Sequence, residues 1–259
     1  LMMEGSLQDP TFRYGDFSSD RLRADLTARF SHSESLRDES HLELQVQAGD
    51  YRWREWQFSQ GEMTAVLHND SLRLSHSSLG AAEEAGLELE LLGHLVPDSL
   101  KLEVTDFRLG SDHYRWQVEG APRMHLLADR SLVIEDLIFS SGEEQVDIYG
   151  TFSMDPSAVM NYSIRNVHLG RISDLVGGRV RFAGRVNGDF ITQSLSQVPI
   201  FEGNLTIRRA EINDRLIGDV DLSSIYSPEE NRFNTRASVY TDPLRYPDYI
   251  AENDSIGQN

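Results

Sequence analysis

LEVTDFRL, the sequence at residues 102–109, changes the spacing of its apolar side chains halfway along. Leu102 and Val104 are two residues apart, Phe107 follows Val104 by three, and Leu109 follows Phe107 by two. Successive side chains of a β-strand point to opposite faces, so an unbroken strand would turn the second apolar pair toward solvent. One extra residue in a β-bulge returns that pair to the first face and bends the strand. The pattern therefore predicts a bulged strand with all four apolar side chains on one face.

The same spacing recurs along the chain, which predicts a repeated structural unit. Copies begin at residues 51, 102, 132, 162 and 205, and the second, third and fourth copies start 30 residues apart. Return strands that contain Gly120, Gly150 or Gly184 follow these three copies. We therefore expect a repeat made of a bulged strand, a turn and a glycine-containing return strand, in which each unit buries its apolar face against its neighbours.

Period-2 alternation of apolar and polar residues runs through most of the remaining sequence. Clear examples are Leu42–Val46 and Leu87–Leu91, and turn-forming residues separate such runs. Residues 22–30 also fit helical spacing, but their neighbours favour a strand. The pattern predicts an all-β protein, an elongated, curved antiparallel β-meander of repeated bulged strands that forms an open, taco-like groove.

The expected organisation is one continuous segment with a tail. Residues 1–240 are predicted to form a single β-repeat groove segment, with at most one short helix near residues 171–177. Residues 241–259 are rich in Pro, Asp and Asn and are expected to form a linker or frayed tail. Neither end of the sequence resembles a finished cap, so we expect a piece of a longer protein.

The composition excludes several classes of function. The chain has 42 acidic and 24 basic side chains, which give a net charge of −18. A negative surface disfavours binding to nucleic acids and docking on anionic lipids through a basic patch. No apolar stretch approaches the roughly 18 residues that span a bilayer. The absence of cysteine excludes disulfides, thiolate chemistry and cysteine-bound metals.

A second motif carries a family resemblance. GSLQDPTF at residues 5–12 reads Gly-x-Leu-x-x-Pro-x-Phe, and residues 188–205 contain a looser echo of it. Together with the alternating strands and Ile217–Val220, this element resembles the repeats of the TamB / AsmA-like family of repeating-β-groove, bridge-like lipid transfer proteins. The likeness is greatest over residues 162–226. The sequence lacks that family's N-terminal anchor and C-terminal end, and residues 76–86 depart from the repeat.

The resemblance implies a periplasmic segment of an inner-membrane-anchored envelope protein that carries phospholipid between the two membranes. The inner-membrane anchor would then lie in sequence outside this chain. In the TamB branch, the translocation and assembly module, the implied partner is an outer-membrane barrel protein of the Omp85 type. The residues alone support an apolar trough, an acidic exterior and no reactive site.

The apolar positions of the repeats are the candidate lining of this lipid groove. They are Trp53, Trp56, Phe58, Leu102, Val104, Phe107, Leu109, Trp116, Val118, Leu132, Ile134, Leu137, Phe139, Val146, Ile148, Tyr162, Ile164, Val167, Val180, Phe182, Leu205, Ile207, Val220 and Leu222. The alternative for this apolar stripe is an ordinary core, covered by a second sheet or by the rest of a longer protein.

Two other functions compete with lipid conduction. The first is a structural or chaperone-like β-surface that assists assembly of outer-membrane or secreted proteins. The second, a carbohydrate-binding sandwich that uses the tryptophans as a platform, is more distant. We expect no enzyme activity, cofactor or metal, because no two histidines have HExxH or HxH spacing. The carboxylate pairs Glu83-Glu84, Glu143-Glu144 and Glu229-Glu230 fall in expected turns, where solvated charge is usual.

Overall fold

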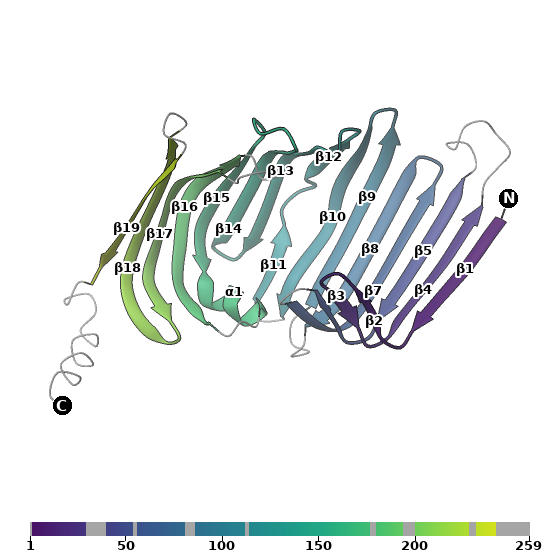
Figure 1. Ribbon diagram of the computed structural model, residues 1–259, viewed down its shortest axis with the longest axis horizontal. Helices are drawn as coiled ribbons and strands as arrows, with labels where there is room; N and C mark the ends of the chain where they lie inside the picture. Colours follow the sequence, from purple (N-terminus) through teal and green to yellow (C-terminus); the bar gives the residue numbers. More distant parts are fainter. Residues whose placement is uncertain are drawn as a thin grey trace. The chain divides into compact units, whose positions relative to one another are not determined.

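The structure is a computed structural model that describes residues 2–29, 40–53, 56–80, 86–111, 114–176, 180–193, 200–227 and 232–241. These residues form nineteen β-strands and one short helix (Figure 1). Neighbouring strands pair in the antiparallel sense in both halves of the chain. The prediction of an all-β, antiparallel meander with one short helix is therefore confirmed.

The chain divides into two compact units. The first comprises Leu1–Ser141 and Tyr149–Ser153, and the second comprises Gly142–Ile148 and Met154–Asn259. The strands of the first unit are β1 (Met2–Asp9), β2 (Phe12–Tyr14), β3 (Phe17–Ser19), β4 (Leu22–Arg29), β5 (His41–Ala48), β6 (Tyr51–Trp53), β7 (Trp56–His68), β8 (Ser71–Gly80), β9 (Gly86–Val96), β10 (Ser99–Ser111), β11 (Tyr114–Val118), β12 (Arg123–Leu127) and β13 (Leu132–Ser141). Strand β14 (Glu144–Phe152) contributes residues to both units.

The main sheet of the first unit runs in the order β1–β4–β5–β7–β8–β9–β10. Strand β10 pairs over one half with β11 and over the other half with β12, and both pair with β13. The segment that fitted both a helix and a strand is strand β4, as predicted. β1 pairs with β4 because the short strands β2 and β3 leave the main sheet.

Strands β2, β3 and β6 form a small side sheet on the first residues of β7. Figure 1 shows the β2–β3 hairpin in front of the main sheet. The ring of Tyr51 on β6 stacks on Phe58, with 4.8 Å between ring centroids, and a Cβ added to Gly61 would lie 2.6 Å from it. The side sheet thus packs against the main sheet at Gly61. Burial of the Tyr51 side chain raises the pKa of its hydroxyl.

The second unit contains one helix and an antiparallel sheet. Its remaining elements are β15 (Val159–His168), α1 (Leu169–Val176), β16 (Phe182–Gln193), β17 (Ile200–Ile212), β18 (Arg215–Ser227) and β19 (Arg232–Tyr240). The strands pair in the order of the chain from β15 to β19. Helix α1 lies where the sequence predicted a short helix. The expected tail lies outside the described residues except for Thr241.

Three predicted bulges are confirmed by the strand register. In β10 the register shifts between Val104 and Asp106, so that Val104 lies opposite Leu91 and Phe107 opposite Leu89. Equivalent shifts separate Ile164 from Val167 in β15 and Ile207 from Ala210 in β17. The extra residue returns the second apolar pair to the same face, as the spacing predicted.

The copies that begin at residues 132 and 51 differ in outcome. In β13, Ile134 and Leu137 are buried while the two residues between them are exposed, which agrees with a change of face at that point. The prediction of a single bulged strand for the copy that begins at residue 51 was wrong. Trp53 ends β6, Trp56 begins β7, and the two lie opposite each other as antiparallel partners. This copy therefore belongs to two antiparallel strands and not to one bulged strand.

Side chains satisfy the backbone donors that two of the bulges leave unpaired. Asn166 and Arg209 have positive φ values of 55° and 52°. The Asn166 N–H donates to Asn187 Oδ1 at 2.8 Å, and the Arg209 N–H donates to Asp219 Oδ1 at 3.0 Å. Asn187 and Asp219 each lie across from the bulge that they satisfy. A single polar residue on the neighbouring strand thus holds each bulge, because an unpaired buried N–H is costly.

Candidate functional site

One face of the main sheet in the first unit is almost entirely apolar. Residues opposite each other on antiparallel strands project to the same face, so the register defines rows of side chains that cross the strands. The first row contains Met3, Ala28, Leu42, Leu67, Leu72, Gly93, Leu102, Met124 and Ile134. The second contains Gly5, Leu26, Leu44, Ala65, Leu74, Leu91 and Val104. The third contains Leu7, Ala24, Val46, Met63, His76, Leu89 and Phe107.

The opposite face of the same strands is polar. One row on it contains Gln8, Arg23, Gln47, Glu62, Ser77, Glu88 and Arg108. The alternation read from the sequence thus becomes two chemically different faces, because each strand keeps its register with the next.

Apart from the end where Tyr51 of the side sheet packs over Gly61, the apolar face lacks a close-packed cover in the part of the chain that the structure describes. None of the large described side chains is fully buried. Met3, Leu7 and Leu26 keep 56%, 50% and 40% of their surface exposed. Ala28 on β4, Val104 on β10 and Trp116 on β11 are nearly inaccessible. The face between these limits is half-buried, which is unlike the core of a closed sandwich.

The second unit has its own apolar face. One of its rows contains Ile164, Gly188, Leu205, Leu222 and Ala237, and the next contains Val167, Val186, Ile207, Val220 and Val239. Tyr162, Phe190 and Phe201 stack beside these rows, with ring centroids 4.6 and 4.7 Å apart. This face is therefore aliphatic in the middle and aromatic to one side.

Most of the predicted lining residues lie on these two faces. Leu109 lies opposite Leu87 and Trp116, and the rings of Phe107 and Phe139 are 4.9 Å apart. The other predicted residues that the register or a ring contact places with the apolar rows are Phe58, Leu102, Val104, Val118, Leu132, Ile134, Tyr162, Ile164, Val167, Leu205, Ile207, Val220 and Leu222. Leu137 is buried, and Val146 and Ile148 on β14 are half-buried.

Three predicted lining residues are not placed on these faces, and a fourth, Phe182, lies at the exposed edge of one of them. Val180 precedes β16 and is 44% exposed. Phe182, the first residue of β16, is 46% exposed and lies opposite the exposed Ile212 at the strand ends. The register shift between Ala183 and Arg185 comes from the extra residue of the β17 bulge, so Phe182 keeps its alternation with Val186 and lies at the edge of the apolar face. The side chains of Trp53 and Trp56 lie outside the described part of the structure.

The sequence prediction omitted the residues that supply most of the apolar face in the first unit. The leucines of β5, β8 and β9 fill its rows, whereas the predicted lining was drawn from the bulged repeats. Their alternation in Leu42–Val46 and Leu87–Leu91 was visible, but it gave no indication of which strands lie side by side.

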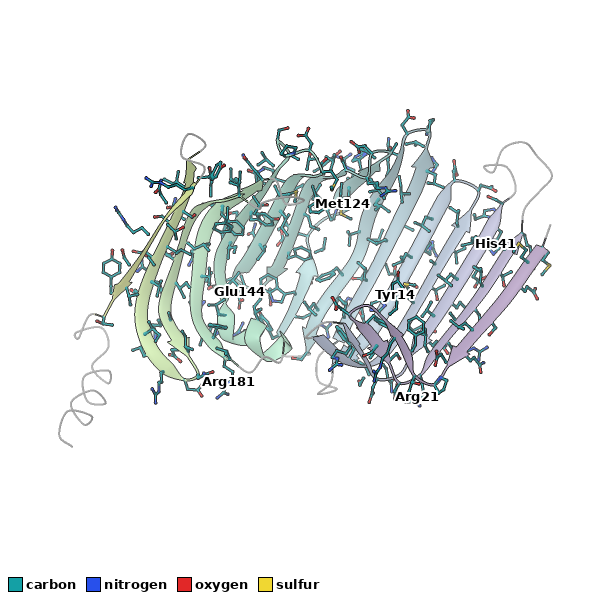
Figure 2. The ribbon with its side chains drawn as sticks, in the orientation of Figure 1. Tyr14, Arg21, His41, Met124, Glu144 and Arg181 are labelled. Atoms are coloured by element: carbon teal, nitrogen blue, oxygen red, sulfur yellow. The ribbon has the colours of Figure 1, made fainter. Side chains whose placement is uncertain are left out.

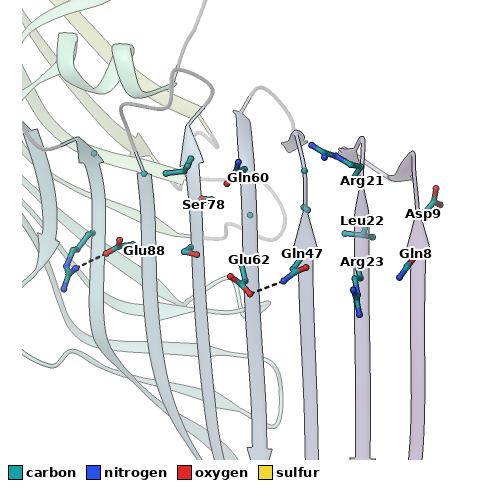
Figure 3. A pocket seen from close by; sticks show the side chains of 18 of the residues that line it. Gln8, Asp9, Arg21, Leu22, Arg23, Gln47, Gln60, Glu62, Ser78 and Glu88 are labelled. Carbon is teal, nitrogen blue, oxygen red and sulfur yellow. Dashed lines mark hydrogen bonds and ion pairs between the residues drawn. The ribbon is translucent and has the colours of Figure 1, made fainter.

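A polar cavity of about 1220 Å³ lies along the polar face of the first unit, at one end of the strands (Figure 3). Gln47 Nε2 donates to Glu62 Oε1 at 3.3 Å, and Arg108 Nη1 donates to Glu88 Oε2 at 2.9 Å. Hydrogen bonds from Ser6 and from Arg23, which lines the cavity, lower the pKa of Asp25. Arg21, Arg23 and Arg108 in this cavity pair with carboxylates, so these three cations add little net positive charge.

Glu144 corrects the prediction of a solvated carboxylate pair at residues 143–144. Its side chain is 4% exposed and accepts hydrogen bonds from the His168 N–H at 2.9 Å and from Arg171 Nη1 at 2.8 Å. Glu144 is the first residue of β14, and its side chain joins the end of β15 to α1. Its burial is compensated by these two donors. The other two predicted pairs lie outside the described residues.

The described residues form no arrangement of three or more histidine and acidic side chains suited to a metal ion. None of the described helices has the length and apolar content needed to cross a bilayer. No protein-family model, curated protein or solved structure matches the chain. The family resemblance drawn from the sequence therefore stays a prediction.

Proposed function

We propose that the apolar faces of this protein bind the acyl chains of phospholipids. The observation that supports the proposal is the set of apolar rows that cross the strands without interruption and stay partly exposed. Removing acyl carbons from water gains about 0.8 kcal/mol per methylene, so a chain of roughly 16 carbons gains about 12 kcal/mol on a continuous apolar surface.

The uniformity of the rows favours movement of lipid over storage. Leucine, alanine and valine repeat from strand to strand in the first unit, so neighbouring positions offer nearly the same environment. A lipid that shifts by one strand exchanges similar contacts, whereas a deep pocket would hold it in one place. In this proposal the protein is a periplasmic segment that passes phospholipid between the inner and outer membranes. Its inner-membrane anchor lies in other sequence, and an Omp85-type barrel is its outer-membrane partner.

A chaperone-like surface is the second candidate function. Among the described strands, β1 pairs only with β4, and β19 pairs only with β18. Each therefore has one edge whose backbone groups have no partner in the described sheet. Such an edge accepts an extended polypeptide as an additional strand. An unfolded outer-membrane or secreted protein is the kind of client that would use it.

Paired substitutions on one strand test the proposal. Leu44 lies in an apolar row, whereas the next residue, Gln45, is exposed on the opposite face of β5. We expect Leu44→Asp to remove about nine-tenths of the phospholipid that co-purifies with the protein, because a carboxylate on the apolar surface is costly to desolvate. Native mass spectrometry after gentle extraction measures bound lipid, and circular dichroism confirms that the variants fold.

Gln45→Asp is the matched control and should keep its lipid. In the second unit, Ile164→Asp and Arg165→Asp form the corresponding pair, since Ile164 lies in an apolar row and Arg165 is exposed. Equal lipid loading in both members of each pair would overturn the proposal. Bound polypeptide without lipid would favour the chaperone-like function.

A further inference from the structure

Four histidines that are far apart in the sequence lie in one row across the polar face of the first unit. His41 lies opposite Arg29 and His68. Ser71 lies opposite both His68 and His94, and Lys101 lies opposite both His94 and His125. The histidine row, defined as Arg29, His41, His68, Ser71, His94, Lys101 and His125, thus crosses seven strands. At about 4.8 Å per strand, it extends about 29 Å.

The row is accessible and lies near one end of the strands. His41 is at the start of β5, and Figure 2 shows it at the opposite end of the strands from Arg21. Arg21 lines the polar cavity. That cavity includes none of the row. The His41 and His68 rings are 5.9 Å apart, and the side chains of His41, His94 and His125 are 33%, 54% and 25% exposed. The row is therefore an extended line of polar groups and not a pocket.

Carboxylates accompany three of the four imidazoles. His41 Nε2 lies 3.7 Å from Glu43, His94 Nε2 lies 3.6 Å from Asp70, and His125 Nε2 lies 2.9 Å from Glu135. Arg123 also pairs with Glu135 at 3.0 Å. Each of these imidazoles thus has an acidic partner within reach.

The other charged groups that the structure describes on this face leave a small excess of negative charge. The cations that lie in the row or beside it are Arg29, Arg73, Lys101 and Arg123, and the nearby carboxylates are Glu43, Asp70, Glu103 and Glu135. Glu4 on β1 and Asp98 in the β9–β10 turn lie further along the same region. The four cations and six carboxylates sum to −2, so the sign of the stripe depends on its four imidazoles, whose protonation would bring the sum to +2.

We propose that the histidine row is a docking surface for an anionic lipid bilayer that engages when its imidazoles are protonated. Imidazoles as a class change charge between about pH 5 and 8, and protonation of all four would turn the slight negative excess of the stripe into a slight positive one. A line of separated charges on an exposed sheet face matches an array of phosphate headgroups better than it matches a single small anion. Local charge decides this interaction, because charges further than about 8 Å away are screened at physiological salt.

The proposal is independent of acyl-chain binding, because the row and the apolar rows lie on opposite faces of the same strands. A bilayer bound through the histidine row leaves the apolar face free. Lipid loading and bilayer docking are therefore measured separately, and failure of one does not imply failure of the other.

Vesicle co-sedimentation tests the proposal. The probe is a vesicle of phosphatidylcholine with phosphatidylglycerol, and vesicles of phosphatidylcholine alone are the zwitterionic control. We expect the bound fraction on anionic vesicles to be about tenfold higher at about pH 5.5 than at about pH 7.5. The double substitution His68→Gln/His94→Gln should remove about nine-tenths of that increase.

His168→Gln is the matched control. His168 is the last residue of β15 in the second unit, so it belongs neither to the row nor to the apolar face of the first unit. This variant should dock as the unmodified protein does. Equal binding at both pH values, or an equal loss in the His168 control, would overturn the proposal. So would complete displacement by millimolar inorganic phosphate, since that result indicates a site for a free anion.

Discussion

At the scale of single residues, His76 shows how the apolar face acts on a polar side chain. Its partners across the sheet are Met63 and Leu89. Burial lowers the pKa of its imidazole, and a hydrogen bond to the Glu62 backbone acts in the opposite direction. The apolar face thus opposes a positive charge at this position, because the charged form loses solvation there.

The lowered pKa of His76 predicts a change of stability with pH. The unfolded chain has the higher, ordinary value of about 6.5, so it binds a proton first as the pH falls. The free energy of unfolding should therefore fall as the pH drops below about 6.5, and this contribution should level off below the folded pKa. We expect His76→Leu to reduce this loss, measured by urea denaturation at about pH 7.5 and 5. Ser75→Ala, on the polar face, should keep the original dependence, and an unchanged pH dependence in His76→Leu would contradict the prediction.

At the scale of elements, Gly203 determines how β16 and β17 pack. It lies opposite Phe190 with a φ of +152°, and an added Cβ would lie 2.4 Å from both Asp189 O and Phe190 Cβ. Phe190 is the middle ring of the stack with Tyr162 and Phe201. The absent side chain leaves room for the backbone of Asp189 and Phe190 on the neighbouring strand.

We expect Gly203→Ala to lower the free energy of unfolding by about 1–3 kcal/mol, because backbone atoms stand in the way and cannot yield as a flexible side chain does. Thermal unfolding followed by circular dichroism measures the effect. Gly5→Ala is the control, because a Cβ there meets no atom within 4 Å and Gly5 lacks a positive φ. A stability loss of equal size in both variants would show that the close approach at Gly203 is unimportant.

At the scale of the whole molecule, each unit presents an apolar face while the protein is folded. Leu44 and Leu74 lie in the same row of the first unit, and the adjacent Gln45 and Ser75 lie on the other face. Ordinary monomers bury such surfaces, so the folded protein should bind apolar molecules from solution.

The folded protein should bind an apolar fluorescent dye at neutral pH, and phospholipid should displace the dye. We expect Leu44→Asp/Leu74→Asp to reduce dye fluorescence by more than about half, since the added charges interrupt one apolar row. The matched variant Gln45→Asp/Ser75→Asp should leave it unchanged. Dye binding only under denaturing conditions would instead indicate that the apolar faces are covered.

The sequence by itself determined the strands and three of the bulges, because both depend on neighbouring residues. Alternation fixes which side chains share a face, and the extra residue in LEVTDFRL appears in the spacing of its apolar positions. The short helix after β15 was predicted for the same reason. These features needed no knowledge of distant segments.

Only the tertiary structure decided which strands lie side by side. It pairs β1 with β4, turns the Trp53–Trp56 segment into two strands, and buries Glu144 beneath His168 and Arg171. It also brings His41, His68, His94 and His125 into one row, although 26 to 31 residues separate each from the next. Backbone hydrogen bonding is nearly the same for any pairing of strands. The choice of partner and register therefore depends on contacts between residues far apart in the chain, which local spacing does not encode.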